Sequence, residues 1–271
     1  MRPARLAPVR PGPAGPGVVL AAHGSRDPRG AAATRALTRA VARLRPDWDV
    51  RAAYLDHSLP RPASALAALA AAGHQRAVLV PLLLTAAYHG RVDVPAEVAA
   101  ARSEGLNLEV AVAEVLGPVA GDIPPLLLDG LLRRLPVRGS VAGDPVWRGD
   151  ELDAVVLVAA GTRDTTARGT VDEVGAALGE RLGLPCAVAY ASASPPTAGE
   201  AVARLRAAGA RRVGVASYFL APGRLYDAAV RSARSAGAVA VAEPLTDAPE
   251  LAELVVARTA EAAGLAVAVA A

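Results

Sequence analysis

The chain contains no lysine and only one cysteine, one phenylalanine and one methionine among its 271 residues. With Cys186 as the single thiol, neither an internal disulfide nor a cysteine-based metal site can form, and a reducing cytoplasm is the simplest location. The missing lysine excludes a Walker-type phosphate loop, and no expected strand is followed by a G-x-G-x-x-G fingerprint. These absences argue against a nucleotide-binding α/β enzyme. We expect Cys186 to be a small core residue of a strand.

Aromatic residues make up only 3% of the chain, and its basic residues are not clustered. The 29 basic residues, all arginine, are scattered among 26 acidic ones, which leaves a net charge of +3. No basic block is interleaved with aromatics, so a nucleic-acid partner is not expected. An arginine-lined cleft for an acidic small molecule remains compatible with this composition, because guanidinium groups pair well with carboxylates.

Long hydrophobic runs are also missing, although 53% of the residues are hydrophobic. No segment approaches the roughly 20 apolar residues that span a bilayer, so we expect no membrane partner. Residues 1–16 carry positive charge and proline without an apolar run. This pattern predicts a disordered, proline-rich tail rather than a signal peptide or an anchor. The remaining length is ample for one large domain or two of ordinary size.

An internal repeat is the main positive feature of the sequence. The string "VVLAAHGSRD" at residues 18–27 returns as "VVLVAAGTRD" at residues 155–164. Three further pairs follow in the same order: "AAYLDHSLP" with "VAYASASPP", "AAGHQRAVLVPLLL" with "AAGARRVGVASYFL", and "LEVAVAEVLG" with "VAVAEPLTD". Matches that keep their order indicate a duplication.

Short Val/Leu/Ala runs alternate with longer Ala/Arg/Leu segments in both halves, which predicts parallel strands alternating with helices. The expected strands are 17–22, 50–55, 77–83, 108–112, 154–160, 186–191, 212–218 and 238–242, and the expected helices of the first half are 28–45, 60–72, 93–104 and 122–134. The predicted fold class is α/β, with two tandem domains that each hold a small parallel sheet flanked by helices. We place these domains at 17–135 and 153–271, joined by a linker at 136–152 in which Trp147 packs on a domain surface.

Residues able to carry chemistry follow three expected strands of the first half. The first strand is followed by His23, the second by Asp56 and His57, and the third by Tyr88 and His89. Ligands of open parallel sheets bind at the carboxyl ends of the strands. We therefore expect these side chains along one edge of the first sheet.

The second half keeps the frame of this edge but loses its chemistry. Ser25 and Asp27, one of which is expected to cap the next helix, return as Thr162 and Asp164. The counterparts of His23, Asp56 and His89 are instead Ala160, Ser192 and Leu225. We infer one functional edge and one that has lost its function.

The other two histidines have simpler interpretations. His74 precedes the third strand, at the opposite edge, and its counterpart is Ala210, so we expect it in a surface loop. His57 lies at the functional edge, where the adjacent Asp56 is the stronger candidate for a direct role.

Two imidazoles and a carboxylate at one edge suit a borderline divalent cation such as Fe²⁺, Co²⁺, Ni²⁺ or Zn²⁺. They also suit proton abstraction, because histidine titrates near neutrality. The residues alone therefore predict a metal site or an acid–base site and leave the substrate unnamed.

At these residues the sequence resembles the short sirohydrochlorin chelatases of the class II chelatase superfamily. That pattern has a strand ending in His-Gly-Ser, an acidic residue before a proline after strand two, and P-x-x-L-x-x-G-x-H-x-x-x-D-I/V-P after strand three. The chain reads "AAHGSRD", "YLDHSLP" and "PLLLTAAYHGRVDVP", a match over most of 17–130 that the degenerate repeat extends to about 260. The sequence departs from this pattern at two positions. Asp56 replaces the usual glutamate, and Ala87 replaces the usual glycine. The second half keeps that glycine, as Gly223.

The resemblance implies a lyase that inserts Fe²⁺, Co²⁺ or Ni²⁺, as substrate, into sirohydrochlorin for sirohaem or cobalamin biosynthesis. It implies no ATP and no permanently bound cofactor. His23 and His89 would hold or deliver the metal and accept the pyrrole protons, and Asp56 would help as a carboxylate ligand or a proton acceptor. The residues expected to contact the acidic tetrapyrrole are Ser25, Arg26, Tyr88 and Arg91, whereas Leu84 mainly packs. Single-domain members are expected to dimerise, so the fused chain should be a monomer.

Two alternatives remain open from the sequence. A non-catalytic carrier of a metal or a tetrapyrrole would use the same edge and would need no proton acceptor. Precorrin-2 is an alternative substrate to sirohydrochlorin. The metal is also not named, because imidazole and carboxylate ligands suit several ions.

Overall fold

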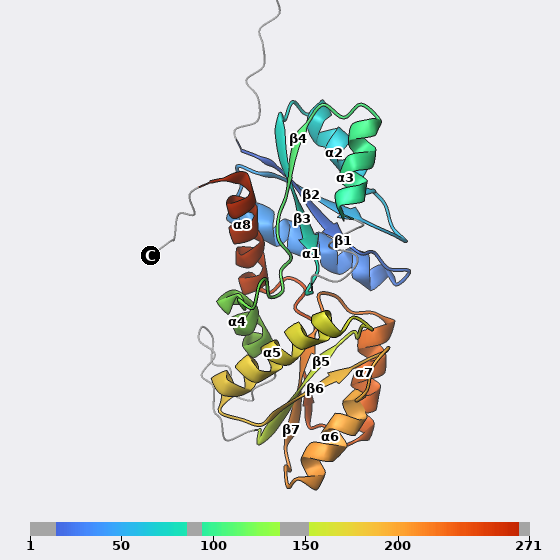
Figure 1. Ribbon diagram of the computed structural model, residues 1–271, viewed down its shortest axis with the longest axis vertical. Helices are drawn as coiled ribbons and strands as arrows, with labels where there is room; N and C mark the ends of the chain where they lie inside the picture. The colour runs from blue at the N-terminus through green and yellow to red at the C-terminus, as the bar shows by residue number, and fades with distance from the viewer. Residues whose placement is uncertain (1–14, 86–93, 136–151, 266–271) are drawn as a thin grey trace, which may run out of the picture.

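Two lobes, each built on a four-stranded parallel sheet, make up the protein (Figure 1). The computed structural model describes residues 15–85, 94–135 and 152–265. The strand order is β2-β1-β3-β4 in the first lobe and β6-β5-β7-β8 in the second. The predicted fold class, α/β with two small parallel sheets flanked by helices, is confirmed. The predicted linker with Trp147 lies outside the described residues, apart from its last position, and so does most of the predicted tail.

The elements lie within a few residues of their expected places. The strands are β1 (Gly17–Ala22), β2 (Asp49–Tyr54), β3 (Arg76–Leu82), β4 (Glu109–Val112), β5 (Ala154–Ala159), β6 (Cys186–Tyr190), β7 (Val213–Tyr218) and β8 (Ala240–Val241). The helices are α1 (Pro28–Leu44), α2 (Pro62–Ala71), α3 (Val94–Ser103), α4 (Pro125–Arg134), α5 (Thr165–Leu182), α6 (Ala198–Ala207), α7 (Arg224–Ser235) and α8 (Pro249–Ala263).

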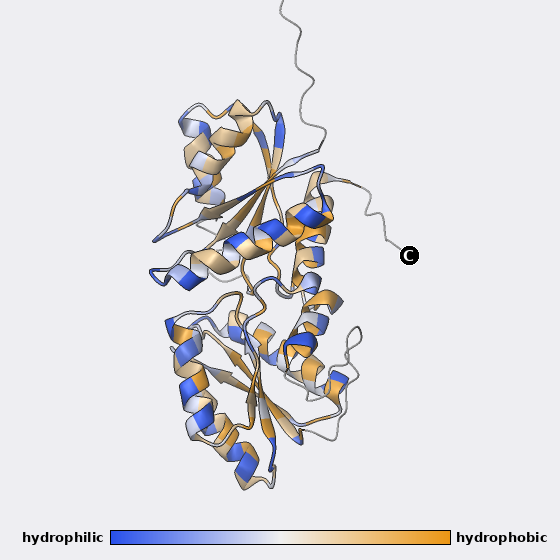
Figure 2. Cartoon of the chain, turned by 180° about the vertical axis from the view of Figure 1, so that it is seen from behind, coloured by the Kyte–Doolittle hydropathy of each residue, from blue (hydrophilic) through white to orange (hydrophobic). Residues whose placement is uncertain are grey.

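The central strands are apolar throughout because helices cover both faces of each sheet. Val18, Val19, Leu20 and Ala21 of β1 are all 0% exposed. The helices instead alternate hydrophilic and hydrophobic residues, as Figure 2 shows along α1. The buried runs and the amphipathic helices therefore explain why the sequence pattern placed these elements correctly.

The register of the first sheet brings three strand ends together. β1 pairs in parallel with β2 and β3, so that Ala22 lies beside Tyr54 on one side and Leu82 on the other. The segments that follow these residues leave the sheet at the same edge. This alignment places His23 next to the turn that carries Asp56.

The last helix of each half packs on the other half. α8 contacts α1, β3 and β4 of the first lobe, whereas α4 contacts α5 and β7 of the second (Figure 1). α4 and α8 also contact each other, and Arg133 of α4 pairs with Glu250 of α8. One continuous hydrophobic core therefore runs through both lobes, with residues from both sheets. The domain boundaries placed at 135 and 153 remain a prediction.

The turn from β1 into α1 recurs in the turn from β5 into α5. Asp27 caps α1 by accepting the N–H of Arg29, and Asp164 caps α5 in the same way. Ser25 Oγ accepts the N–H of Asp27 at 3.0 Å, and Thr162 Oγ1 accepts that of Asp164 at 3.1 Å. These bonds confirm that the residues shared by both halves build the turn and the helix start.

His74 corrects an expectation from the sequence, because it does not lie in an exposed loop. Its side chain is only 3% exposed, and its Nε2 lies 3.5 Å from Oδ2 of Asp49, the first residue of β2. The carboxylate of Asp49 offsets the free-energy cost of burying the polar imidazole ring. The alignment of His74 with Ala210 in the repeat gave no sign that Asp49 is its partner.

Cys186 is half-buried against the main core, in agreement with the expected packing role. Burial raises the pKa of its thiol to about 11, which keeps it protonated near neutrality.

Among the described residues, no helix has the length and apolar character needed to cross a membrane.

Candidate active site

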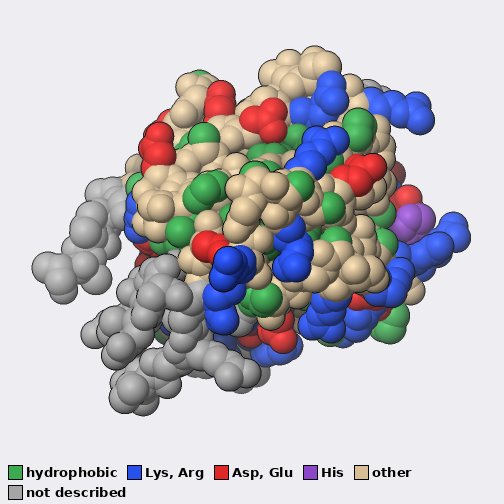
Figure 3. Space-filling view, turned by 90° about the horizontal axis from the view of Figure 1, so that it is seen from below, with side chains coloured by type: hydrophobic (Ala, Val, Ile, Leu, Met, Phe, Trp, Pro, Cys, Tyr) green, Lys and Arg blue, Asp and Glu red, His purple; other side chains and the backbone are tan. Residues whose placement is uncertain are grey.

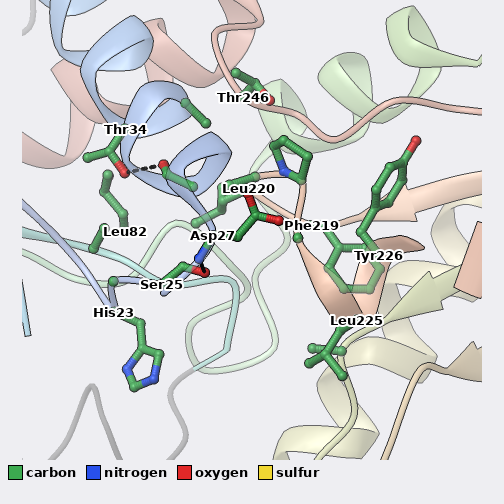
Figure 4. A pocket seen from close by; sticks show the side chains of 18 of the residues that line it. His23, Ser25, Asp27, Thr34, Leu82, Phe219, Leu220, Leu225, Tyr226 and Thr246 are labelled. Atoms are coloured by element: carbon green, nitrogen blue, oxygen red, sulfur yellow. Dashed lines mark hydrogen bonds between the residues drawn. The ribbon is translucent and has the colours of Figure 1, made fainter. Parts of the chain in front are cut away.

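The carboxyl edge of the first sheet borders a cleft of about 550 Å³ between the lobes. One wall is the β1–α1 turn with His23, Ser25 and Arg26, and the other is formed by residues 219–226 of the second half. Figure 4 shows His23 and Ser25 across the pocket from Phe219 and Leu225. The volume falls within the roughly 300–1,000 Å³ typical of small-molecule sites.

His23 directly follows β1 and is exposed in this cleft. Its ring centroid lies 6.3 Å from that of His57, with the ring planes at 83° to each other. The carbonyl of His23 accepts the N–H of Asp56 at 2.8 Å, which ties the two turns together. The structure therefore places these three residues side by side, as the shared sheet edge predicts.

Asp56 is oriented by its neighbour. Its Oδ1 accepts the backbone N–H of His57 at 2.7 Å, and its Oδ2 lies 3.4 Å from His57 Nε2. The backbone hydrogen bond from His57 lowers the pKa of Asp56, and electrostatic interaction with the side chains of His57, His23 and Arg61 lowers it further. The carboxyl group is therefore an anion at neutral pH, with a side chain that is 58% exposed.

The backbone that carries Asp56 and His57 is part of the repeated frame. His57 has a φ of 59°, and its counterpart Ala193 has a φ of 63°. Left-handed φ values are uncommon for non-glycine residues. Since both halves adopt this conformation, the turn is structural, and the imidazole of His57 is an addition of the first half.

The second lobe contributes a wall that the sequence analysis did not assign to the site. Phe219 and Tyr226 pack edge to face, with ring centroids 5.9 Å apart. Tyr226 donates its hydroxyl to the carbonyl of Ala242 at 3.1 Å, and partial burial raises its pKa. The only sequence signal for this wall is its alignment with the third motif of the first half.

An ion bridge joins the lobes next to the cleft. Arg29 of α1 lies 2.6 Å from Oδ2 of Asp27 and 2.6 Å from Oδ2 of Asp227 on α7. A second bond of 3.2 Å runs from Arg29 Nη1 to Oδ1 of Asp227. Hydrogen bonds from Arg29 lower the pKa of both carboxyl groups. All three side chains therefore remain charged across the physiological range.

Asp227→Asn is expected to lower the urea midpoint of unfolding slightly at low ionic strength and not at all in about 1 M salt, where exposed pairs are screened. Arg29 is 49% exposed, so the bridge is accessible to counter-ions. Equilibrium unfolding in urea at both salt concentrations tests this. A shift of equal size at high salt would show that the contact does not act through charge.

A second, smaller cleft of about 220 Å³ is the repeat counterpart of the first. The β5–α5 turn with Ala160 and Thr162 forms one wall, and residues 82–85 of the first half contribute to the other. Leu84 packs against the main core, and its carbonyl accepts the hydroxyl of Tyr218 at 2.8 Å. None of the described residues that line this cleft is charged or a histidine.

Several predicted site residues lie outside the described ranges, namely Tyr88, His89 and Arg91. Of the others, His23, Ser25 and Arg26 line the larger cleft, and Asp56 stands beside His57 at its rim. Within the described ranges, no three His, Cys, Asp or Glu side chains converge in a group able to hold a metal ion. The described residues therefore supply only part of a metal-binding set.

A comparison with known families agrees with the internal repeat. The model of the CbiX family matches residues 17–130 and again residues 154–262. The chain belongs to the CbiX family. Both halves are recognised, including the half in which alanine replaces the histidine.

Similar proteins include a sirohydrochlorin cobaltochelatase of Priestia megaterium, 24% identical over 213 residues that cover 77% of this chain. The chain spans 65% of the length of that relative. The fold matches SirB from Bacillus subtilis with Fe³⁺, with a TM-score of 0.74, 20% identity and coverage of 91% of this chain and 95% of the other. SirB from Bacillus subtilis subspecies spizizenii in complex with cobalt gives a TM-score of 0.72 at 18% identity, covering 92% and 95%.

Proposed function

We propose that the chain is a sirohydrochlorin chelatase, a lyase that inserts Fe²⁺, Co²⁺ or Ni²⁺ into the tetrapyrrole without ATP. The observation that carries this is the one-sided chemistry of the repeat. His23 lines the larger cleft from the end of β1, whereas the repeat counterpart at the end of β5 is Ala160, which borders both clefts. Membership of the CbiX family supports the proposal, as do the cobaltochelatase name of one relative and the iron and cobalt in the SirB structures.

Insertion of a divalent cation releases the pyrrole protons, which need acceptors. A neutral imidazole and an ionised carboxylate are the resting states that bind a cation and take up protons. We assign His23 and His89 to hold the incoming metal and to accept pyrrole protons, and Asp56 to act beside them as a carboxylate ligand or a proton acceptor. The lowered pKa of Asp56 supports this assignment, because it keeps the carboxylate ionised.

We assign Ser25, Arg26, Tyr88 and Arg91 to contact the acidic macrocycle. Ser25 and Arg26 line the cleft, which supports their assignment. The chain would act in the cytoplasm, in sirohaem or cobalamin biosynthesis. It would act as a monomer, since its own two lobes already enclose a cleft. Light scattering tests this state, and a tight dimer would contradict it.

The direct test is the anaerobic absorbance of sirohydrochlorin mixed with Fe²⁺ or Co²⁺, with and without the protein. We expect a metal-dependent spectral conversion faster than the protein-free control, and the two rates identify the preferred ion. Binding of the pigment without faster conversion would replace the chelatase with a carrier. Precorrin-2 in place of sirohydrochlorin separates the two candidate substrates.

Asp56→Asn is expected to slow conversion about 100-fold, the lower range for loss of a general base. The folded pKa of Asp56 is depressed, so its charge is present above the ordinary value of about 3.9 and is lost only as the pH falls through the lowered value. The ratio of native to variant rates should therefore be constant between about pH 5 and pH 8. Initial rates across this range test it. A ratio that varies would show that Asp56 titrates there.

A further inference from the structure

The described linings of the two clefts differ in charge as well as in their content of histidine. The larger cleft is lined by Arg26 from the first half and Arg224 from the second, whereas no charged residue is found among the described residues of the smaller one. Neither guanidinium has a carboxylate partner in the described part of the chain. Arg26 belongs to the repeated frame and returns as Arg163, whereas Arg224 has no arginine counterpart in the first half.

An ion pair neutralises the negative charge in the described lining of the larger cleft. Asp27 is the one carboxylate among the described residues that line it, and Arg29 holds it at 2.6 Å. The uncompensated charge of the described lining is thus positive. A ligand with carboxylates at its edge would match it, because guanidinium and carboxylate groups form paired, charge-assisted hydrogen bonds.

The remainder of the cleft is apolar. Leu82 lines it from the first sheet, and Phe219, Leu220 and Leu225 line it from the second half. Figure 4 shows Leu225 and Phe219 on the side opposite His23. Leu225 is 43% exposed and adds apolar surface to this wall. An apolar surface bordered by arginines fits a flat, apolar ring with carboxylates around its edge.

The position of Arg224 in the repeat points the same way. It aligns with Tyr88, and the next residue, Leu225, aligns with His89. The second half has therefore lost a histidine and gained an arginine in a wall that faces His23. Arg163, the counterpart of Arg26, is absent from the described lining of the smaller cleft.

We propose that Arg26 and Arg224 form a two-lobe clamp that binds the carboxylates of a flat polycarboxylate ligand. Under the chelatase function proposed above, on which the identity of this ligand rests, the clamp holds sirohydrochlorin by its acidic side chains while His23 faces the ring. The second half is then a substrate-binding half, with Arg224 as a binding residue. It does not need to touch the metal.

Equilibrium binding of metal-free sirohydrochlorin, followed by its absorbance, tests the clamp separately from catalysis. Arg26→Gln and Arg224→Gln should each raise Kd about tenfold, the order expected for one charge-assisted pair, and the double variant should raise it further. The matched controls are Arg163→Gln, the repeat counterpart, and Arg234→Gln on the same helix α7, which should leave Kd unchanged. The fully esterified pigment, which lacks the negative charges, should bind all five variants and the native chain equally.

The outcomes separate the clamp from the chelatase. Conversion by the native chain with unchanged Kd in Arg224→Gln would overturn the clamp alone. Arginine-dependent binding without conversion would overturn the chelatase alone. No binding by the native chain would overturn both. Equal weakening by Arg163→Gln would also overturn the clamp, because it would show a general effect of net charge.

Discussion

His23→Ala is expected to reduce the rate of metal insertion about 1,000-fold, within the range for loss of a positioned base or ligand. The side chain leads into the cleft from the end of β1, 6.3 Å from the ring of His57. His57 is held next to Asp56 by the left-handed turn, so it cannot take over the position of His23. Single-turnover absorbance with saturating pigment measures the loss.

The repeat supplies the control for this variant. The second half carries Ala160 in the same strand–turn–helix frame, with the same glycine conformation and the same type of cap. The free energy of unfolding of His23→Ala should therefore stay within about 0.5 kcal/mol of the native value. A native rate in this variant would refute the assignment of His23, whereas a large stability loss would show that the histidine also supports the fold.

Gly24→Ala is expected to destabilise the protein by at least about 3 kcal/mol, because two penalties combine. Gly24 has a φ of 93°, and an added Cβ would lie 1.8 Å from the carbonyl oxygen of Asp56. Glycine is the residue that tolerates both conditions. The clash would also displace the segment that carries Asp56 and His57. Urea unfolding measures the first effect, and the insertion rate at low temperature measures the second.

Gly161→Ala is the matched variant in the other half. Its φ is 96°, and an added Cβ would lie 1.9 Å from the carbonyl oxygen of Ser192. We expect a similar loss of stability but a much smaller loss of activity in the folded protein, because no histidine is among the described residues that line the smaller cleft. Gly183→Ala, at a φ of 63° with nothing within 4 Å, should cost only about 1 kcal/mol. Equal costs at all three positions would refute the role of the close contacts.

Local patterns in the sequence were enough to predict the sheets. The apolar runs around Leu20 and Leu157 are short because the strands are short, and their burial on both faces removes any alternation. The repeated turn was equally accessible, since Asp27 and Asp164 occupy the same place in two matching strings. Strand ends of one parallel sheet meet at one edge, which correctly placed His23, Asp56 and His57 together.

Long-range packing was not accessible in the same way. The apolar face of α8 shows that the helix must be covered, but not that α1 and β3 of the first lobe cover it. The second wall of the cleft, at Phe219 and Tyr226, depends on how the lobes pack and has no local signature. The burial of His74 depends on Asp49, a residue on another strand. Each of these features is a contact between segments that are distant in sequence.

The exchange of α4 and α8 between the lobes has a consequence for cooperativity. Each sheet is completed by a helix from the other half, so neither half has a full core of its own. The two lobes should then unfold as one cooperative unit rather than melt in sequence. Fraying of α8 would loosen β3 and with it the sheet edge from which His23 extends.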